Sequence, residues 1–172
     1  MALASDSDHE HPTQFPRPPT RITDQADRSI SIDTHADDPE PLVAMYERFD
    51  EESRAQGLPP RQEPRIRDWV SLLLEDGYNV VARHGDDVVG HAALVPHDDT
   101  SELAIFVHPD YQSAGIGTHL IRGLLGHGQS RGLTHVWLSV ARTNRIAMNL
   151  YRSAGFETTL RERGEYEMAR SI

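Results

Sequence analysis

The alternation of apolar and polar positions divides this chain into an unpatterned start and a patterned body. Residues 1–27 contain four prolines and show no apolar periodicity, which predicts a disordered N-terminal tail. Residues 28–33 alternate apolar with polar side chains, which predicts a short strand. Apolar side chains then recur at helical spacing from Leu42 and again from Ile66, which predicts two helices. We therefore expect one folded domain over residues 28–172.

The middle of the chain has the pattern of three consecutive strands. Apolar stretches at residues 78–83, 88–95 and 102–107 are separated by two short polar segments that contain turn-forming residues. Segments this short join neighbouring antiparallel strands, so the three stretches predict a meander.

The pattern changes after the meander to that of a crossover. Residues 115–128 and 145–154 carry apolar side chains at helical spacing, and residues 134–140 form an apolar strand. A strand, a helix and a second strand in this order form a parallel pair, so the last meander strand and residues 134–140 should run in the same direction. Two final strands are expected at residues 158–163 and 165–169. Together these elements predict an α/β fold.

Composition narrows the class of protein. The chain has 172 residues and a mass of 19.3 kDa, which is the size of one domain. It has no cysteine, which excludes a disulfide framework, a thiolate metal site and a cysteine nucleophile. It also has no apolar run of about 18 residues and no basic segment followed by an apolar one at its start. We therefore expect a cytoplasmic protein without a membrane partner.

The charge balance argues against polyanionic partners. Acidic residues number 27 and basic residues 17, and the net charge of −10 disfavours binding to nucleic acid. Every basic residue is an arginine. A bias toward GC-rich codons and adaptation to high salt both account for this composition, and both stay open.

A strand ending at Val107 is followed by a loop with Gly115 and Gly117 and then by a helix. The first turn of a helix presents unpaired N–H groups, and glycines let its backbone approach an anion closely. The segment therefore suits a phosphate, although a plain helix start with two glycines has the same spacing. It is not a Walker loop, because no Gly-Lys-Ser/Thr follows, and Leu120 replaces the third glycine of a dinucleotide fingerprint.

Two motifs lie in order along this part of the chain. They are Val107-x-Pro109-x-x-Gln112-x-x-Gly115-x-Gly117 and Asn144-x-x-Ala147-x-x-Leu150-Tyr151-x-x-x-Gly155-Phe156. Together they resemble the acetyl-CoA loop and the second motif of the GNAT superfamily of N-acetyltransferases, and the resemblance covers about residues 28–172. It implies a mixed, mostly antiparallel twisted sheet of about seven strands, with a central splayed parallel pair and about four flanking helices.

The resemblance implies that acetyl-CoA binds as a co-substrate between the splayed strands. Main-chain groups of Phe106 and Val107 would hydrogen-bond its pantetheine as an added strand does. Backbone N–H groups of the loop would hold its pyrophosphate, and the expected residues are Gln112, Ala114, Gly115, Gly117 and Thr118. A basic residue is frequent in the family where this chain has Ser113 and Ala114, so Arg145 or Arg152 is expected to assist at the nucleotide end.

The resemblance also assigns catalytic roles. Tyr151 matches the family tyrosine that protonates the departing thiolate, although its helix position also suits a core aromatic. Asn144 is expected to cap its helix and to contact the cofactor. For the general base we expect Glu102, acting directly or through water, and then His108, which should face solvent. The remaining histidines show no metal-ligand spacing, so we expect no metal.

These expectations favour an enzyme that transfers the acetyl group of acetyl-CoA to a primary amine by direct attack in a ternary complex. The acceptor would be a small-molecule amine or a peptide, and a homodimer stays open. One alternative is a catalytically silent acyl-CoA-binding module, and another is a protein or peptide N-terminal acetyltransferase. Residues 50–67, between the first two predicted helices, mix both charges and do not identify the acceptor.

Overall fold

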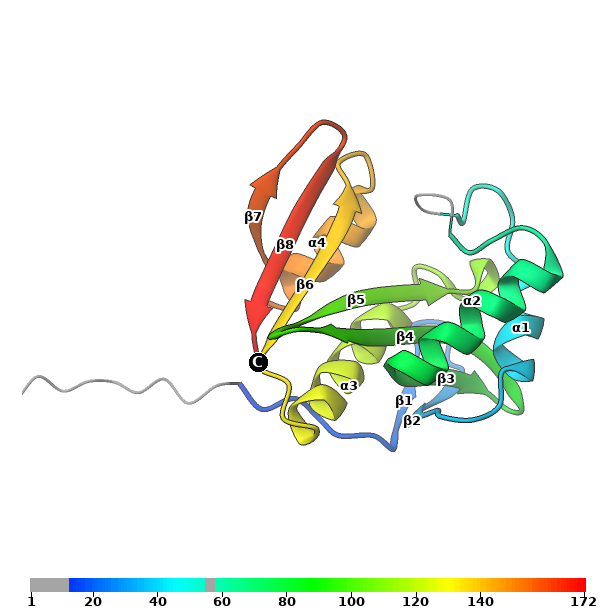
Figure 1. Cartoon of the computed structure of the whole chain (residues 1–172). Coiled ribbons are helices and arrows are strands. Elements are labelled where there is room, and N and C mark those ends of the chain that lie inside the picture. The colour runs from blue at the N-terminus through cyan, green and yellow to red at the C-terminus, as the bar shows by residue number, and fades with distance from the viewer. Residues whose placement is uncertain (1–12, 55–57) are drawn as a thin grey trace, which may run out of the picture.

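The computed structural model describes residues 13–54 and 58–172 of the chain. Within these ranges one twisted sheet contains eight strands (Figure 1). The strands are β1 (Thr20–Thr23), β2 (Ser29–Thr34), β3 (Tyr78–His84), β4 (Asp87–His97), β5 (Thr100–Val107), β6 (His135–Ala141), β7 (Glu157–Arg161) and β8 (Glu165–Ser171).

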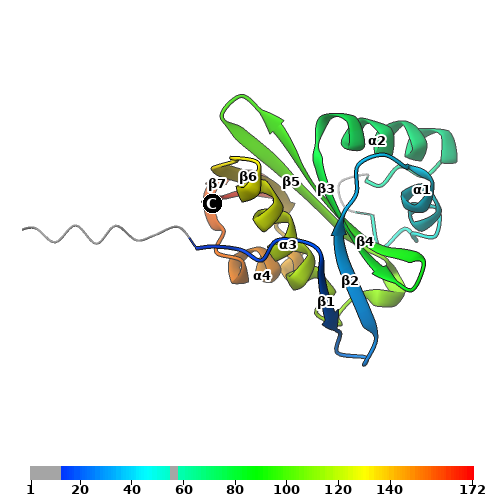
Figure 2. The same cartoon turned by 90° about the horizontal axis from the view of Figure 1, so that it is seen from below.

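Four α-helices and one short 3₁₀ helix accompany the sheet in the described part of the chain. They are α1 (Glu40–Tyr46), α2 (Glu63–Asp76), η1 (Pro109–Tyr111), α3 (Ile116–Ser130) and α4 (Arg145–Ser153). Helices α1 and α2 cover one face of the sheet, while α3 and α4 lie on the other (Figure 2).

The strand order is β1-β2-β3-β4-β5-β6-β8-β7, and every neighbouring pair except β5–β6 is antiparallel. The predicted mixed sheet with a central parallel pair is confirmed. The parallel ladder is short, because it joins Ser101 to Val136 and Glu102 to Trp137 and then stops. Beyond it the two strands diverge, so that β6, β8 and β7 splay away from the rest of the sheet (Figure 1).

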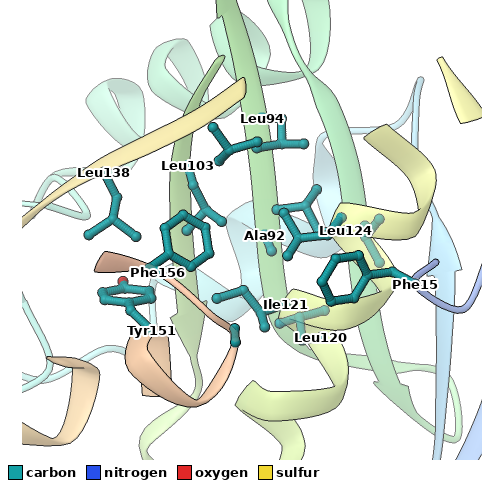
Figure 3. Close-up of a cluster of buried hydrophobic side chains, with 14 of the residues drawn as sticks. Phe15, Ala92, Leu94, Leu103, Leu120, Ile121, Leu124, Leu138, Tyr151 and Phe156 are labelled. Atoms are coloured by element: carbon teal, nitrogen blue, oxygen red, sulfur yellow. The ribbon is translucent and has the colours of Figure 1, made fainter. Parts of the chain in front are cut away.

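Strand β4 shows why the meander has its pattern. Its residues are buried from Val88 to Leu94, because helices pack on both faces of this part of the sheet. A strand covered on both faces has a continuous apolar run where a half-exposed strand alternates. The larger of the two apolar clusters lies between the sheet and α3, with Phe15 near one end and Tyr151 and Phe156 near the other (Figure 3).

The expected tail is wrong for residues 13–27, whereas residues 1–12 lie outside the described part. Strand β1 pairs with β2 and brings the sheet to eight strands rather than about seven. Ahead of it, Phe15 is buried, and its N–H donates to Oε1 of Gln129 on α3 at 3.0 Å. A Cβ at Gly126 would lie 2.1 Å from the carbonyl oxygen of Pro16, so only glycine admits this segment. The segment ahead of β1 packs on α3 through the ring of Phe15 and through main-chain atoms, so its sequence shows no apolar periodicity.

A buried polar chain joins α1 to the meander. The Tyr46 hydroxyl lies 2.6 Å from Nδ1 of His91, and Nε2 of His91 lies 2.7 Å from Oδ1 of Asn79. Because an amide oxygen can only accept, Nε2 carries the histidine proton and Nδ1 accepts from the hydroxyl. Burial, with a smaller contribution from His35, lowers the pKa of His91 to about 3, so the ring is neutral.

None of the helices in the described part of the chain combines the length and apolar character needed to span a bilayer.

Candidate active site

A cavity of about 620 Å³ occupies the region where β5 and β6 diverge. Its walls come from five places: the segment after α1, the end of β5, the loop and first turn of α3, the end of β6, and α4. Parallel strands that separate leave unpaired main-chain groups on their facing edges, so this cavity offers hydrogen bonds as well as volume.

The loop between η1 and α3 has the backbone of an anion-binding cradle. Ser113 and Gly115 both have left-handed backbone conformations, with φ values of 58° and 87°. Left-handed residues alternating with right-handed ones turn successive N–H groups to one side. Gln112, Ser113, Gly115, Gly117 and Thr118 line the cavity where α3 begins, so the N–H groups of a 15-residue helix face it.

Two residues of this loop, Ala114 and Gln112, make hydrogen bonds that hold the loop in place. Ala114 is buried and does not line the cavity, and its carbonyl oxygen accepts the N–H of Gln25 at 2.9 Å. The Gln112 side chain donates from Nε2 to the carbonyl oxygen of Val107 at 3.1 Å, which ties the loop to the end of β5. The loop is therefore fixed on two sides.

The register of β4 and β5 decides which main-chain groups of β5 face the cavity. The N–H of His108 donates to the carbonyl of Val89, and Phe106 pairs with His91 two residues earlier in the same ladder. Hydrogen-bonded and non-hydrogen-bonded pairs alternate, so Phe106 turns both main-chain groups to β4. This corrects the expectation for the main chain of Phe106. Val107 faces the other way, and its N–H remains for a ligand.

Tyr151 lies in α4 and contributes to the cavity wall. Tyr151 is 8% exposed, and its ring packs edge-on to Phe156 at 6.1 Å between ring centroids (Figure 3). The Tyr151 hydroxyl has no hydrogen-bond partner among the described residues, and its oxygen keeps some exposed surface. Burial raises the pKa of Tyr151 to about 12, so the phenol keeps its proton at neutral pH.

Asn144 has both a structural position and an open side to the cavity. Its side-chain oxygen accepts the N–H of Ala147 at 3.1 Å, which confirms the expected N-cap of α4. It also lines the cavity, together with Ile146 on the first turn of the helix.

The two expected bases lie in different surroundings. Glu102 is exposed on β5 at the closed end of the splay, opposite Trp137, and its side chain is outside the cavity wall. His108 is 5% exposed, contrary to the expectation that it faces solvent. Its Nδ1 accepts the N–H of Asp110, and its Nε2 has no partner in the described ranges. Burial, followed by the charge of Arg48, lowers the pKa of His108.

Sequence reasoning missed a hydroxyl–carboxylate pair at this site. Ser139 on β6 lines the cavity, and its Oγ donates to Oε2 of Glu165 on β8 at 3.0 Å. Val136, Leu138 and Val140 join the core on the α3 side, so Ser139 lies on the opposite face of the sheet from Tyr151. Only the register of β6 with β8 brings Ser139 and Glu165 together, and no local sequence pattern predicts this contact.

No group of three or more histidine, aspartate or glutamate side chains within residues 13–54 and 58–172 is arranged to hold a metal ion.

Comparison with known proteins agrees with this geometry. The sequence profile described as "Acetyltransferase (GNAT) family" matches residues 40–156. The chain belongs to the GNAT family of acetyltransferases. The GNAT domain of S. lividans PAT has the same fold, with a TM-score of 0.78 at 18% identity over 90% of this chain and 97% of that one.

Two further comparisons extend the likeness. The [ribosomal protein bS18]-alanine N-acetyltransferase of Escherichia coli (strain K12) is 40% identical over 65 residues, which are 37% of this chain and 44% of that protein. The chain thus aligns with less than half of that relative's length. A crystal structure of PaiA N-acetyltransferase from Thermoplasma acidophilum in complex with coenzyme A has a TM-score of 0.67 at 17% identity, covering 83% of this chain and 99% of that one.

Proposed function

We propose that this protein transfers the acetyl group of acetyl-CoA to a primary amine by direct attack, without a covalent enzyme intermediate. The observation that carries the proposal is the single cavity wall that combines an anion cradle, the free edge of β5 and the hydroxyl of Tyr151. A catalytically silent acyl-CoA-binding module would need the first two features but not the third.

The chain's own residues fit acetyl-CoA at three points. The cradle at residues 112–118 has left-handed backbone at Ser113 and Gly115, and Gly117 opens its helical turn to a phosphate. The N–H of Val107 faces the place of a strand that would lie between β5 and β6. When bound there, acetyl-CoA supplies a thioester, whose acetyl carbon an amine can attack.

Tyr151 is the proposed acid. A phenol that is still protonated at neutral pH can give its proton to the sulfur as the carbon–sulfur bond breaks. Burial raises the pKa of Tyr151, which by itself opposes proton loss. A thiolate formed in the same buried surroundings is equally deprived of water, and its basicity rises with that of the phenol.

The proposed base lies on the other face of the sheet. Glu102 remains the candidate from the sequence, acting through water because its side chain is outside the cavity wall. A second candidate is Glu165, whose Oε2 accepts a hydrogen bond from Oγ of Ser139. In that route the amine proton passes to Oγ of Ser139 while the hydroxyl proton passes to the carboxylate of Glu165.

The charges on the face of the sheet that bears Ser139 favour a cationic amine as the acceptor. On the face that bears Ser139, β8 carries Glu165 and Glu167 by register, and β5 carries Glu102. Three carboxylates on this face attract a protonated amine before it loses its proton. The likeness to an enzyme named as a ribosomal-protein-alanine N-acetyltransferase supports a second candidate acceptor, a protein or peptide N-terminus.

Release of free CoA thiol from acetyl-CoA, measured over a panel of polyamines, amino acids and N-terminal peptides, tests the proposal. We expect saturable turnover with at least one cationic amine or peptide, and loss of that turnover in Tyr151→Phe. Tight binding of acetyl-CoA without acetylation of any amine would instead support the silent module.

A further inference from the structure

The turn between β1 and β2 contacts the cofactor loop from outside the cavity. The N–H of Gln25 donates to the carbonyl oxygen of Ala114 at 2.9 Å. A guanidinium nitrogen of Arg28, Nη1, lies 3.2 Å from the carbonyl oxygen of Asp110. These two carbonyls lie at either end of the segment that contains the left-handed residue Ser113.

Arg28 is itself held in place by a buried carboxylate. The side chain of Asp24 has no exposed surface, and its Oδ2 accepts Nε of Arg28 at 2.7 Å. Its Oδ1 accepts the N–H groups of Ala26 and Arg28 at 3.0 and 2.9 Å. Burial opposes ionisation of Asp24, but the hydrogen bonds from Arg28 and Ala26 outweigh it, and its pKa is lowered. The carboxylate thus presents Arg28 in one orientation.

The same guanidinium packs on a residue of the cavity wall. Its Cζ lies 4.1 Å from the ring centroid of Tyr111, which lines the cavity. The Tyr111 hydroxyl lies 2.7 Å from Nδ1 of His84 on β3, so Tyr111 is held at both its face and its edge. Gln112, the next residue, begins the cradle.

We propose that Asp24, Gln25 and Arg28 are positioning residues that hold the loop at residues 110–115 in its anion-binding conformation before the cofactor arrives. The inference rests on the proposed assignment of residues 112–118 to the pyrophosphate. A non-glycine residue in left-handed backbone costs free energy and persists where its surroundings fix it. A loop that is already ordered loses less conformational entropy when the ligand binds, which raises affinity without a new contact.

Arg28 also places a positive charge beside a loop that has no basic residue of its own. No basic side chain occurs from Pro109 to Thr118. Arg28 comes from a segment 82 residues earlier than Asp110, and the contact exists only because β1 is part of the sheet. An acetyl-CoA site in this acidic protein therefore depends on the first strand of its fold.

The test compares two thioesters in Arg28→Gln, with Arg21→Gln on β1 as the matched control. Arg21 is exposed, and its side chain makes no hydrogen bond, ion pair or ring contact with another described residue. We expect the dissociation constant for acetyl-CoA to rise about tenfold in Arg28→Gln. The KM for S-acetylpantetheine, which lacks the pyrophosphate, should change less than about twofold, with the same kcat. Arg21→Gln should match the parent for both thioesters.

Hydrogen exchange gives a second measurement that does not depend on turnover. Amides of residues 110–115 in the ligand-free protein should exchange faster in Arg28→Gln than in Arg21→Gln, while those of α4 stay the same. Equal affinity of Arg28→Gln and the parent for acetyl-CoA would overturn the proposal, as would equal weakening for both thioesters. Gly117→Asp distinguishes failure of this inference from failure of the proposed cofactor site. If that variant binds acetyl-CoA as well as the parent does, the assignment of residues 112–118 to the pyrophosphate is itself wrong.

Discussion

Gly117 of α3 packs against Leu150 of α4 beside the cavity, and a Cβ at position 117 would lie 3.3 Å from Cδ2 of Leu150. The first turn of the helix that carries the cradle thus lies directly against the helix that carries Tyr151. The proposed binding and proton-transfer parts of the site therefore share one packing contact.

Gly117→Asp is expected to weaken acetyl-CoA binding about 30-fold or more, equivalent to about 2 kcal/mol. The substitution adds a negative charge where the phosphates are proposed to lie. Gly117→Ala is the matched control, because it makes the 3.3 Å contact without the charge, and the flexible end of Leu150 can move aside. Calorimetry on both variants separates packing from charge. Equal affinities for the Asp variant and the parent would remove the loop from the binding site.

Tyr151→Phe is expected to lower kcat by about 10²- to 10⁴-fold and to leave the KM for acetyl-CoA nearly unchanged. The substitution keeps the ring against Phe156 but removes the proton donor. Because the pKa of Tyr151 is raised to about 12, this group should not reduce the rate of the parent enzyme up to about pH 10. Steady-state kinetics with a pre-steady-state check that chemistry limits the rate measure both effects. Unchanged turnover would make Tyr151 a core residue only.

Glu102→Gln and Glu165→Gln are expected to differ in the acidic limb of the pH profile of kcat/KM. In the acidic limb, kcat/KM of the parent falls as the pH is lowered, because the base becomes protonated. Removing the base therefore lowers the plateau value of kcat/KM and flattens that limb. If Glu165 receives the proton through Ser139, Ser139→Ala reproduces the effect of Glu165→Gln and Glu102→Gln does not. An effect confined to Glu102→Gln would assign the base to β5 and leave the Ser139–Glu165 pair a structural contact.

The free energy of unfolding is expected to fall as the pH drops from 7 to 5, and His91 should contribute about 2 kcal/mol of that loss. The pKa of His91 is lowered to about 3, whereas an unfolded histidine titrates near 6.5. Between these values the unfolded chain binds a proton that the folded chain does not, so acid favours unfolding. Below about pH 3 this contribution no longer changes.

Urea unfolding at pH 7, 6 and 5 measures the effect, and His91→Gln is the control. Burial also lowers the pKa of His108 and of His127, but both residues are present in the parent and in the variant, so the difference between the two slopes isolates His91. Parallel slopes for the two proteins would show that the Tyr46–His91 contact does not resist protonation.

Features carried by short contiguous segments could be predicted from the sequence. The meander, the crossover and the parallel pair followed from local periodicity and short connections, and the structure confirms them. The loop motif and the N-cap at Asn144 were equally local, because glycine spacing and capping depend on a few neighbouring residues.

Other features needed the tertiary structure because they join residues far apart in sequence. The packing of residues 13–27 depends on glycine in α3, and the burial of His108 depends on the ring of Phe49 after α1, whose centroid lies 6.0 Å away. The direction of the Phe106 main chain depends on the register with β4. Apolar periodicity reports how one segment is covered, but it does not specify which distant segment covers it.

The sequence by itself therefore determined the class of fold, the family motifs and the position along the chain of the loop that we propose binds the cofactor. Only the tertiary structure decided that Ser139 meets Glu165 and that Arg28 meets Asp110. The physical reason is that hydrogen bonds between strands and loops depend on register and packing, which are set by the whole sheet rather than by any local sequence.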